Sequence, residues 1–302
     1  MKKTGQELNS IFSVAEEMVK NNGEDCYFYG VNDDDFIIAS FDGCGGSGSK
    51  KYENYSGKTG AYIASRAVCG GVETWFKESN KSVELPDYIQ KSLSVCKDYA
   101  DKAGRIMGSL GKAFPTTASI ITGNTGKSKD LLSISCFWAG DSRCYMLDDE
   151  GLHQLTTDDL DGQDAMSNLT NDGVMTNVIN ASTPFEIHFK EVVIDHPCIL
   201  LTATDGCFGY LNSPMEFEHL LIDTLVDSKS IIQWRILLND RMHQVSGDDY
   251  TLCVAACGYK NFENMRSSFN NRKQYITDMY INNSEDVNAL WEVYKNDYSK
   301  YL

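Results

Sequence analysis

A short apolar run that leads directly into an aspartate and three glycines constrains this chain more than any other feature. Residues 36–46 read Phe-Ile-Ile-Ala-Ser-Phe-Asp-Gly-Cys-Gly-Gly. Residues 36–39 are short and uniformly apolar, which predicts a buried strand, and the glycines allow backbone angles and close approaches that other residues exclude. Asp42 therefore ends a strand beside accessible backbone, where carboxylate and carbonyl oxygens suit a hard cation. Taken alone, an Asp-Gly pair more commonly marks a turn.

The residues before this strand predict a β-hairpin. Residues 25–31 and 36–41 are rich in β-forming side chains and flank a polar, turn-forming run. In an antiparallel pair, the start of one strand lies beside the end of its neighbour. We therefore expect Glu24 and Asp25 to lie at the same sheet edge as Asp42. The preceding residues 5–20 fit either a helix or an extended segment.

The rest of the chain combines amphipathic helices with β-strands. The irregular, polar residues 157–180 predict a surface segment, and residues 47–51 predict a polar loop. Apolar stripes at helical spacing predict helices over residues 64–76, 89–107, 213–225, 232–242 and 284–298. Short β-rich runs predict strands over residues 117–122, 131–139, 144–147, 152–156, 186–194, 198–204 and 250–256.

The composition is that of an ordinary soluble globular protein, with 302 residues, 42% hydrophobic and 23% charged. No apolar run is long enough to cross a membrane and the first residues lack a signal-peptide core, so we expect a cytoplasmic protein without a membrane partner. The formal net charge of -16 argues against nucleic acid. The ten cysteines and five histidines lack ligand spacing, so we expect reduced core thiols and structural imidazoles. We also expect a monomer.

Four aspartates share one local context, at a predicted strand end where the chain changes direction. They are Asp42, Asp141, Asp205 and Asp248. Carboxylates gathered at one edge of a sheet repel each other unless cations neutralise them, so metal binding is the simplest common explanation. For any one of these residues alone, a turn-capping role is the more frequent alternative.

The motifs around these aspartates occur in an order that resembles a known enzyme family. In chain order they begin at Lys20 (Lys-Asn-Asn-Gly-Glu-Asp), Phe41 (Phe-Asp-Gly-Cys-Gly-Gly), Pro115 (Pro-Thr-Thr-Ala), Ala139 (Ala-Gly-Asp-Ser-Arg), Ala203 (Ala-Thr-Asp-Gly) and Gly247 (Gly-Asp-Asp-Tyr-Thr). Over about residues 15–257 the series resembles the metal-dependent serine/threonine protein phosphatases of type 2C, and is more similar to the compact bacterial members. The resemblance implies an α+β fold, with a central sandwich of two antiparallel β-sheets flanked by helices on both sides.

The resemblance also implies a site for two Mn²⁺ or Mg²⁺ ions, with a weaker third ion at Asp141 and Asp205. Oxygen-only coordination favours these hard cations over zinc. The implied ligands are the bridging carboxylate of Asp42, the carbonyl of Gly43, the carboxylates of Asp205 and Asp248, and Glu24 and Asp25 through metal-bound waters.

The implied reaction is removal of phosphate from phosphoserine and phosphothreonine of a protein substrate. Two cations about 3.5 to 4 Å apart lower the pKa of a bridging water, giving a hydroxide that attacks phosphorus, and they stabilise charge on the phosphoryl oxygens. The catalytic groups would be Asp42, Asp205, Asp248 and Glu24. No protein nucleophile is required, and Cys44 lacks the phosphate-cradling run of a tyrosine-phosphatase cysteine.

Two positions depart from the pattern of that family. Lys20 stands where the family commonly has a phosphate-binding arginine, and a lysine offers a point charge in place of a bidentate fork. Cys44 stands where the family often has a histidine that can act as a general acid. These departures leave two alternatives open, namely a weak or inactive phosphatase-like binding module and a hydrolase of small phosphate esters. Arg143 is expected to brace the sheet.

The sequence after residue 258 has no strand pattern. We therefore expect a phosphatase domain over residues 1–258 and a helical C-terminal extension over residues 259–302. Its apolar stripe of Val287, Leu290, Trp291, Tyr294 and Tyr298 predicts docking on the domain, with partner binding as the alternative.

Overall fold

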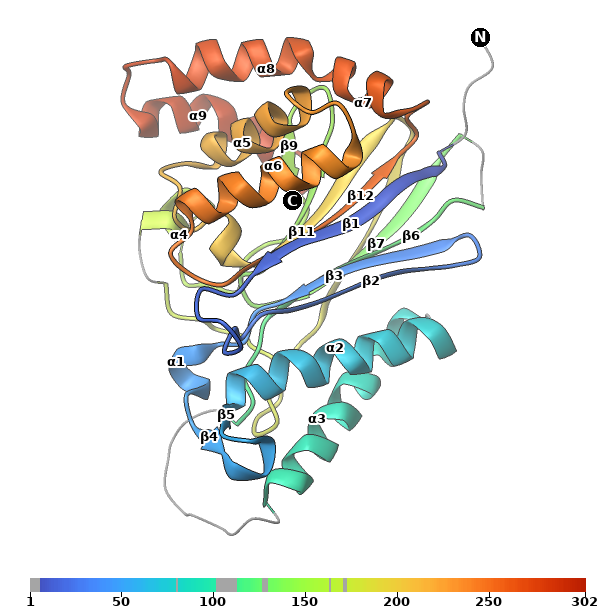
Figure 1. Cartoon of the computed structure of the whole chain (residues 1–302), viewed down its shortest axis with the longest axis vertical. Helices are drawn as coiled ribbons and strands as arrows, with labels where there is room; N and C mark the ends of the chain where they lie inside the picture. Colours follow the sequence, from blue (N-terminus) through green and yellow to red (C-terminus); the bar gives the residue numbers. More distant parts are fainter. Residues whose placement is uncertain (1–5, 80, 102–112, 127–129, 163, 171–172) are drawn as a thin grey trace.

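The apolar run at residues 36–39 forms the middle of β3 (Asp35–Phe41), a central strand of one of two stacked sheets (Figure 1). The computed structural model describes residues 6–79, 81–101, 113–126, 130–162, 164–170 and 173–302. Its two five-stranded sheets are antiparallel, with helices on the outer face of each. The predicted α+β sandwich is therefore confirmed.

The first sheet has the order β1-β12-β11-β8-β9. Its strands are β1 (Leu8–Glu16), β8 (Arg143–Leu147), β9 (Leu152–Gln154), β11 (Cys198–Ala203) and β12 (Tyr250–Cys257). The N-terminal segment, which the sequence left open between helix and extended chain, is a strand. It pairs antiparallel with β12, from Leu8 opposite Cys257 to Glu16 opposite Tyr250.

The second sheet has the order β10-β7-β6-β3-β2. Its other strands are β2 (Cys26–Asn32), β6 (Ala118–Asn124), β7 (Leu132–Ala139) and β10 (His188–Ile194). The predicted hairpin is present, because β2 and β3 pair with Cys26 opposite Phe41. Asp25 and Asp42 therefore adjoin paired residues at the same edge.

Strand β3 is buried on both faces, as its uniform apolar run predicts. Phe36 and Ile38 pack into the core between the two sheets, whereas Ile37 and Phe41 pack against the helices outside the second sheet. The Ser40 hydroxyl lies 2.9 Å from the Thr202 hydroxyl, so a buried hydrogen bond joins the two sheets near the end that carries the glycines.

Two helices, α2 (Gly60–Glu78) and α3 (Leu85–Asp101), cover the second sheet (Figure 1). Residues Ala103 and Met107 of the predicted second helix lie outside the described residues. On the other sheet lie α5 (Pro214–Val226) and α6 (Ile231–Val245), which begin after the caps Ser213 and Ser230.

The segment from Gly45 to Thr59 is more regular than the loop predicted over residues 47–51. It contains the short helix α1 (Gly45–Gly48) and the two-stranded sheet of β4 (Lys51–Tyr52) and β5 (Lys58–Thr59). The N–H of Gly48 donates to the Cys44 carbonyl at 2.8 Å, which closes one turn. In the irregular segment after residue 156, α4 (Ser167–Thr170) is likewise a single turn.

The C-terminal residues form helices that pack on the first sheet side, above α5 and α6 (Figure 1). These are α7 (Phe262–Ser268), α8 (Asn270–Ile276), a π-helical turn (Thr277–Ile281) and α9 (Val287–Tyr298). Sequence patterns predicted only the last of them. Trp291 and Tyr294 are buried, and the Tyr294 hydroxyl donates to Glu218 of α5 at 2.5 Å. The C-terminal helices share one hydrophobic core with the first sheet. The domain boundary expected at residue 258 stays a prediction.

Among the described residues, no helix is both long enough and apolar enough to span a membrane. Cys253 and Cys257 lie in the buried strand β12, in keeping with the expected core position of the thiols.

A truncation in α9 tests whether the C-terminal helices stabilise the sandwich. Trp291 is 3% exposed and donates from Nε1 to Asp164 at 2.9 Å. We expect Trp291→Ala to lower the free energy of unfolding by about 3 to 5 kcal/mol, because it opens a cavity and removes the hydrogen bond to Asp164. Val293, which is 61% exposed on the same helix, provides the control, and Val293→Ala should change stability by less than about 0.5 kcal/mol. Equal effects of the two substitutions in urea unfolding would contradict docking.

A buried imidazole also ties α9 to the sheet. The ring of His153 lies 2.6 Å from the Asp297 carbonyl through Nδ1 and 3.2 Å from Asp148 through Nε2. Burial disfavours the charged ring, but the hydrogen bond and charge of Asp148 outweigh it and raise the pKa of His153 above 6.5. Burial likewise raises the pKa of Asp148, but the hydrogen bond from His153 outweighs it, and the net pKa lies below 3.8.

This ion pair predicts a pH-dependent stability. The contribution of Asp148 is lost as pH falls through its lowered pKa, and that of His153 is lost as pH rises from 6.5 through its raised pKa. The loss of stability in His153→Gln should therefore be largest between pH 3.8 and 6.5 and shrink at higher pH. Denaturant titrations across pH would measure it, with His243→Gln on α6 as the exposed control. A constant difference from pH 5 to pH 9 would contradict the ion pair.

Candidate functional site

All but one of the carboxylates that the sequence singled out gather in one cavity of about 390 Å³, and the exception is Asp25. This cavity lies at the end of the sandwich where β3 and β11 finish and β12 begins. Its lining includes Glu24, Asp42, Asp141, Asp205, Asp248 and Asp249, together with Gly43. Residues far apart in sequence therefore converge, as the strand-end positions predicted.

Asp42 is held by its backbone at the end of β3. Its carbonyl accepts from the Thr116 hydroxyl at 2.6 Å and from the Thr117 N–H at 2.8 Å. Gly43 forms an isolated antiparallel bridge with Thr116, and a Cβ on Gly43 would lie 2.5 Å from the carbonyl oxygen of Ala61. A glycine is therefore required here, because the chain passes close to another backbone. The Pro-Thr-Thr motif thus anchors the peptide that carries Asp42.

Asp205 and Asp248 approach each other through a second close backbone contact. Asp205 opens the 3-10 turn Asp205–Cys207 directly after β11. The Ser246 hydroxyl donates to the Gly206 carbonyl at 2.8 Å, which joins this turn to the residues before β12. A Cβ on Gly206 would lie 1.9 Å from the carbonyl oxygen of Asp249. Only glycine lets the two segments approach this closely.

Glu24 and Asp25 precede β2 but face different neighbours. The Thr59 hydroxyl donates to Glu24 Oε1, and a Cβ on Gly45 would lie 2.3 Å from Glu24 Oε2. Asp25 lies beyond the lining of the main cavity, in an adjacent pocket of about 270 Å³. Its Oδ2 accepts from the Thr204 hydroxyl at 2.8 Å.

Asp141 lies in the turn between β7 and β8, and its neighbour Arg143 points away from the cavity. Asp141 Oδ1 is buried and has no hydrogen-bond partner within the part of the chain that the structure describes. Arg143 is 2% exposed, pairs with Asp158 at 2.7 Å and lies over the Phe208 ring. Arg143 therefore braces the first sheet, as predicted, and does not face a substrate.

Lys20, like Asp25, is a predicted site residue that does not line the cavity. It is exposed in the loop between β1 and β2 and is absent from the cavity lining. Cys44, the second departure, does line the cavity, where its N–H donates to the Pro115 carbonyl at 3.1 Å.

The cavity concentrates negative charge. Burial and the charges of Asp205 and Asp25 raise the pKa of Asp42 well above its usual value of 3.8. Burial and the charge of Asp205 raise the pKa of Asp141 to about 7, and burial and the charge of Asp248 raise that of Asp205 to about 6. The lining contains no lysine or arginine among the described residues that would compensate this charge.

The donor set suits a hard divalent cation. Carboxylate and carbonyl oxygens are the preferred ligands of Mn²⁺ and Mg²⁺, and the orphaned Asp141 oxygen is a further acceptor aimed at no hydrogen-bond donor. Across the described ranges, however, no cluster of three or more His, Cys, Asp or Glu side chains is arranged to hold an ion as it stands.

Several residues that shape the site were not assigned a role from the sequence. Asp249 lines the cavity, and Thr59, Ser65, Thr116 and Thr204 hydrogen-bond to the peptides or side chains of the acidic residues. Thr116, Thr204 and Asp249 lie inside the quoted motifs, and these motifs were the signal that the sequence offered for them. Thr59 and Ser65 lie in no motif, and the sequence offered no signal for them. Their contacts with Glu24 form only when α2 packs beside the hairpin.

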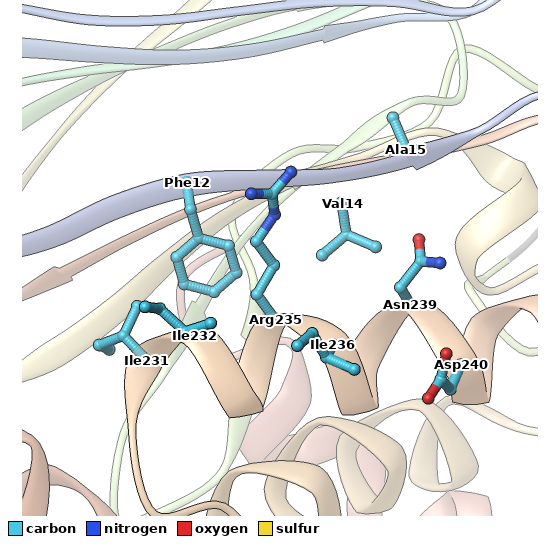
Figure 2. A pocket seen from close by; sticks show the side chains of 9 residues that line it. All are labelled: Phe12, Val14, Ala15, Ile231, Ile232, Arg235, Ile236, Asn239 and Asp240. Atoms are coloured by element: carbon cyan, nitrogen blue, oxygen red, sulfur yellow. The ribbon is translucent and has the colours of Figure 1, made fainter.

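A larger cavity of about 520 Å³ lies between β1 and α6 (Figure 2). Phe12, Val14, Ile232 and Ile236 project into it, and Arg235 reaches across to donate to the Ser13 carbonyl at 2.9 Å. Its lining has one carboxylate, Asp240, at the rim. It lacks the convergent acidic groups of the smaller cavity, which is therefore the candidate active site.

Comparison with solved structures identifies the class of fold. The serine/threonine phosphatase PstP of Mycobacterium tuberculosis superposes with a TM-score of 0.57 at 16% identity, over 82% of this chain and 98% of that one. The phosphatase Stp1 of Staphylococcus aureus gives a TM-score of 0.59 at 16% identity, over 85% and 97%. A PstP catalytic domain in complex with two manganese ions gives 0.54 at 14% identity, over 83% and 98%.

These likenesses define a type 2C-like phosphatase fold, that of the bacterial metal-dependent serine/threonine phosphatases. The sequence matches no family model and no curated protein. The likeness therefore rests on the arrangement of the elements in space.

A pair of glycine substitutions tests the close approach of Gly206 to the backbone of Asp249. Gly206→Ala should lower the free energy of unfolding by about 1 to 3 kcal/mol, because the added Cβ meets the Asp249 backbone. Gly46→Ala is the matched control, since a Cβ there has no atom within 4 Å. Thermal and urea unfolding would measure both variants. Equal stability of the two would contradict the close approach of the Asp205 and Asp248 segments.

Proposed function

We propose that this protein is a metal-dependent phosphomonoester hydrolase that removes phosphate from phosphoserine and phosphothreonine of proteins. The observation that carries the proposal is the convergence of Glu24, Asp42, Asp141, Asp205 and Asp248 on one cavity of a type 2C-like fold. Without cations, such a cavity would repel a phosphate. A site that combines these carboxylates with an anionic substrate therefore requires divalent ions.

Asp42 would be the shared ligand of two Mn²⁺ or Mg²⁺ ions, and the Gly43 carbonyl, Asp205 and Asp248 would complete the direct ligands. Glu24 would reach the ions through water. Asp25 would act from the adjacent pocket, and Asp141 with Asp205 would hold a weaker third ion. When bound, these ions would activate water for attack on phosphorus and neutralise charge on the phosphoryl oxygens.

The protein's own residues would hold these ligands and shape the cavity. Hydrogen bonds from Thr116 and Thr117 fix the Asp42 peptide, and the Thr204 hydroxyl orients Asp25. Met175 and Val178 form an apolar part of the lining, which limits water beside the substrate. Gly46 leaves open space at the rim where a phosphate would enter. Lys20, on the loop that also carries Glu24, would meet the phosphate if that loop moves inward.

A phosphoprotein is the proposed substrate, since the phosphatases of similar fold are serine/threonine phosphatases. Small phosphate esters would use the same carboxylates, so both substrate types belong in the test. The proposed working form is a monomer, with residues 1–258 as the phosphatase domain and residues 259–302 docked on it.

Substitution of the bridging aspartate tests the reaction directly. We expect Mn²⁺-dependent hydrolysis of p-nitrophenyl phosphate and of a phosphothreonine peptide by the wild-type protein. Asp42→Asn should lower kcat/KM at least about 100-fold, because the neutral amide cannot bridge two cations. Removal of the metal with a chelator should abolish turnover, and added Mn²⁺ should restore it.

The matched control is Asp149→Asn, an exposed aspartate in the turn between β8 and β9. It should retain wild-type turnover. Absence of turnover in the wild-type protein with Mn²⁺, or full turnover in Asp42→Asn, would contradict the proposed function. Hydrolysis of p-nitrophenyl phosphate without hydrolysis of the phosphothreonine peptide would indicate a hydrolase of small phosphate esters.

A phosphatase-like binding module is the second candidate. It is favoured by the exposed position of Lys20, by Cys44 in the cavity lining, and by the lack of a preassembled metal cluster among the described residues. Titration calorimetry with Mn²⁺ separates the two candidates. Heat of binding that disappears in Asp42→Asn supports the enzyme, whereas no binding supports the binding module.

A further inference from the structure

The loop between β1 and β2 carries both Lys20 and Glu24 but has no regular structure of its own. It spans residues 17–25, and most of its residues before Gly23 are exposed. Its turn includes Asn21, whose φ of 64° lies in the left-handed region. The loop's own hydrogen bonds join Asn21 to Glu17 and Asn22 to Val19, all before Gly23. The peptide of Glu24 is therefore held by contacts from outside the loop.

One carboxylate closes this loop. Asp249, immediately before β12, accepts from the Met18 N–H through Oδ1 at 2.8 Å. Through Oδ2 it accepts from the Glu24 N–H at 2.7 Å. Hydrogen bonds to an ionised acceptor are stronger than neutral ones, and these two join both ends of the loop to a single side chain.

The opposite side of the loop is held by α2. Arg66 donates to the Gly23 carbonyl at 3.0 Å, and the Ser65 hydroxyl donates to the Glu24 carbonyl at 2.5 Å. The Glu24 peptide is therefore fixed through its N–H by an acid and through its carbonyl by residues of α2. These contacts join the loop to both layers of the fold, since β12 and α2 lie on opposite sides of the β2–β3 hairpin (Figure 1).

From these contacts we infer that Asp249 is a positioning residue, which holds the β1–β2 loop so that Glu24 faces the cavity. The inference deepens the proposed phosphatase function and rests on it where activity is concerned. Asp249 acts through Glu24 and does not itself need to touch a cation or a substrate.

The geometry requires an aspartate at this position. Both oxygens of Asp249 face backbone N–H donors, whereas an asparagine presents one oxygen and one NH₂ group. In Asp249→Asn, either the Met18 or the Glu24 N–H would face another donor. This substitution changes almost no volume and so isolates the hydrogen bonds from packing.

Hydrogen exchange of the loop is the first readout, because it needs neither metal nor substrate. We expect amides within residues 17–25 to exchange at least about tenfold faster in Asp249→Asn, with β12 unchanged. Arg66→Gln, which loosens the same peptide from the α2 side, should accelerate the same amides. Asp149→Asn is the matched control and should leave the exchange of this loop at the wild-type rate.

Metal dependence is the second readout. If Asp249 positions Glu24, the Mn²⁺ concentration that gives half-maximal activity should rise about 10- to 100-fold in Asp249→Asn, while kcat at saturating Mn²⁺ stays near the wild-type value. A rise in the half-maximal Mn²⁺ concentration with unchanged exchange of residues 17–25 would indicate that Asp249 is itself a metal ligand. That result would overturn the inference. Unchanged loop exchange with unchanged Mn²⁺ dependence would also overturn it.

The two proposals fail separately. A wild-type protein with no phosphatase activity contradicts the proposed function, while the exchange of residues 17–25 still decides whether Asp249 holds the loop. An active wild-type protein whose loop is unaffected by Asp249→Asn contradicts the positioning role alone.

Discussion

Mutual repulsion among carboxylates is the constraint on which the candidate site depends. Asp42, Asp141, Asp205 and Asp248 line one cavity, and burial together with neighbouring charge raises the pKa of each. An isolated peptide with these groups would separate them. The sandwich holds them together because each lies just before or after a strand. Hydrogen bonds within the sheets fix the positions of these strands, and the apolar core between the two sheets holds the sheets against each other.

The contacts nearest the cavity anchor backbone as much as side chains. Thr116 and Thr117 bind the Asp42 carbonyl, Ser246 binds the Gly206 carbonyl, and Asp249 binds the N–H groups of the β1–β2 loop. Gly43 and Gly206 lie where another backbone passes too close for a Cβ. The peptides that carry the acidic residues are thereby fixed by contacts that leave the carboxylates of Asp42, Asp205 and Asp248 in the lining of the cavity.

Much of the fold could be predicted because the strands have clear boundaries. Runs such as residues 198–204 are apolar and short and end at Asp-Gly, and the hairpin of β2 and β3 has a polar turn at its predicted place. The N-terminal strand stayed ambiguous, because its apolar positions fit either period until β12 was available as a partner. Helices α7 and α8 were missed since their sequence carries few apolar positions, and they are stabilised by packing on α5.

The sequence alone placed Asp42 and Asp205 after predicted strands and Glu24 and Asp248 before others, and it predicted the antiparallel hairpin that brings Glu24 beside Asp42. The resemblance of the motif series supplied the two antiparallel sheets and the expectation of one common site. The tertiary structure alone decided that Lys20 lies outside the cavity lining, that Asp25 occupies an adjacent pocket, and that Asp249 bonds to the β1–β2 loop. The physical reason is the separation along the chain of the residues that interact. Strand ends follow from local pattern, whereas a contact between residues 18 and 249 depends on how two sheets and their loops pack.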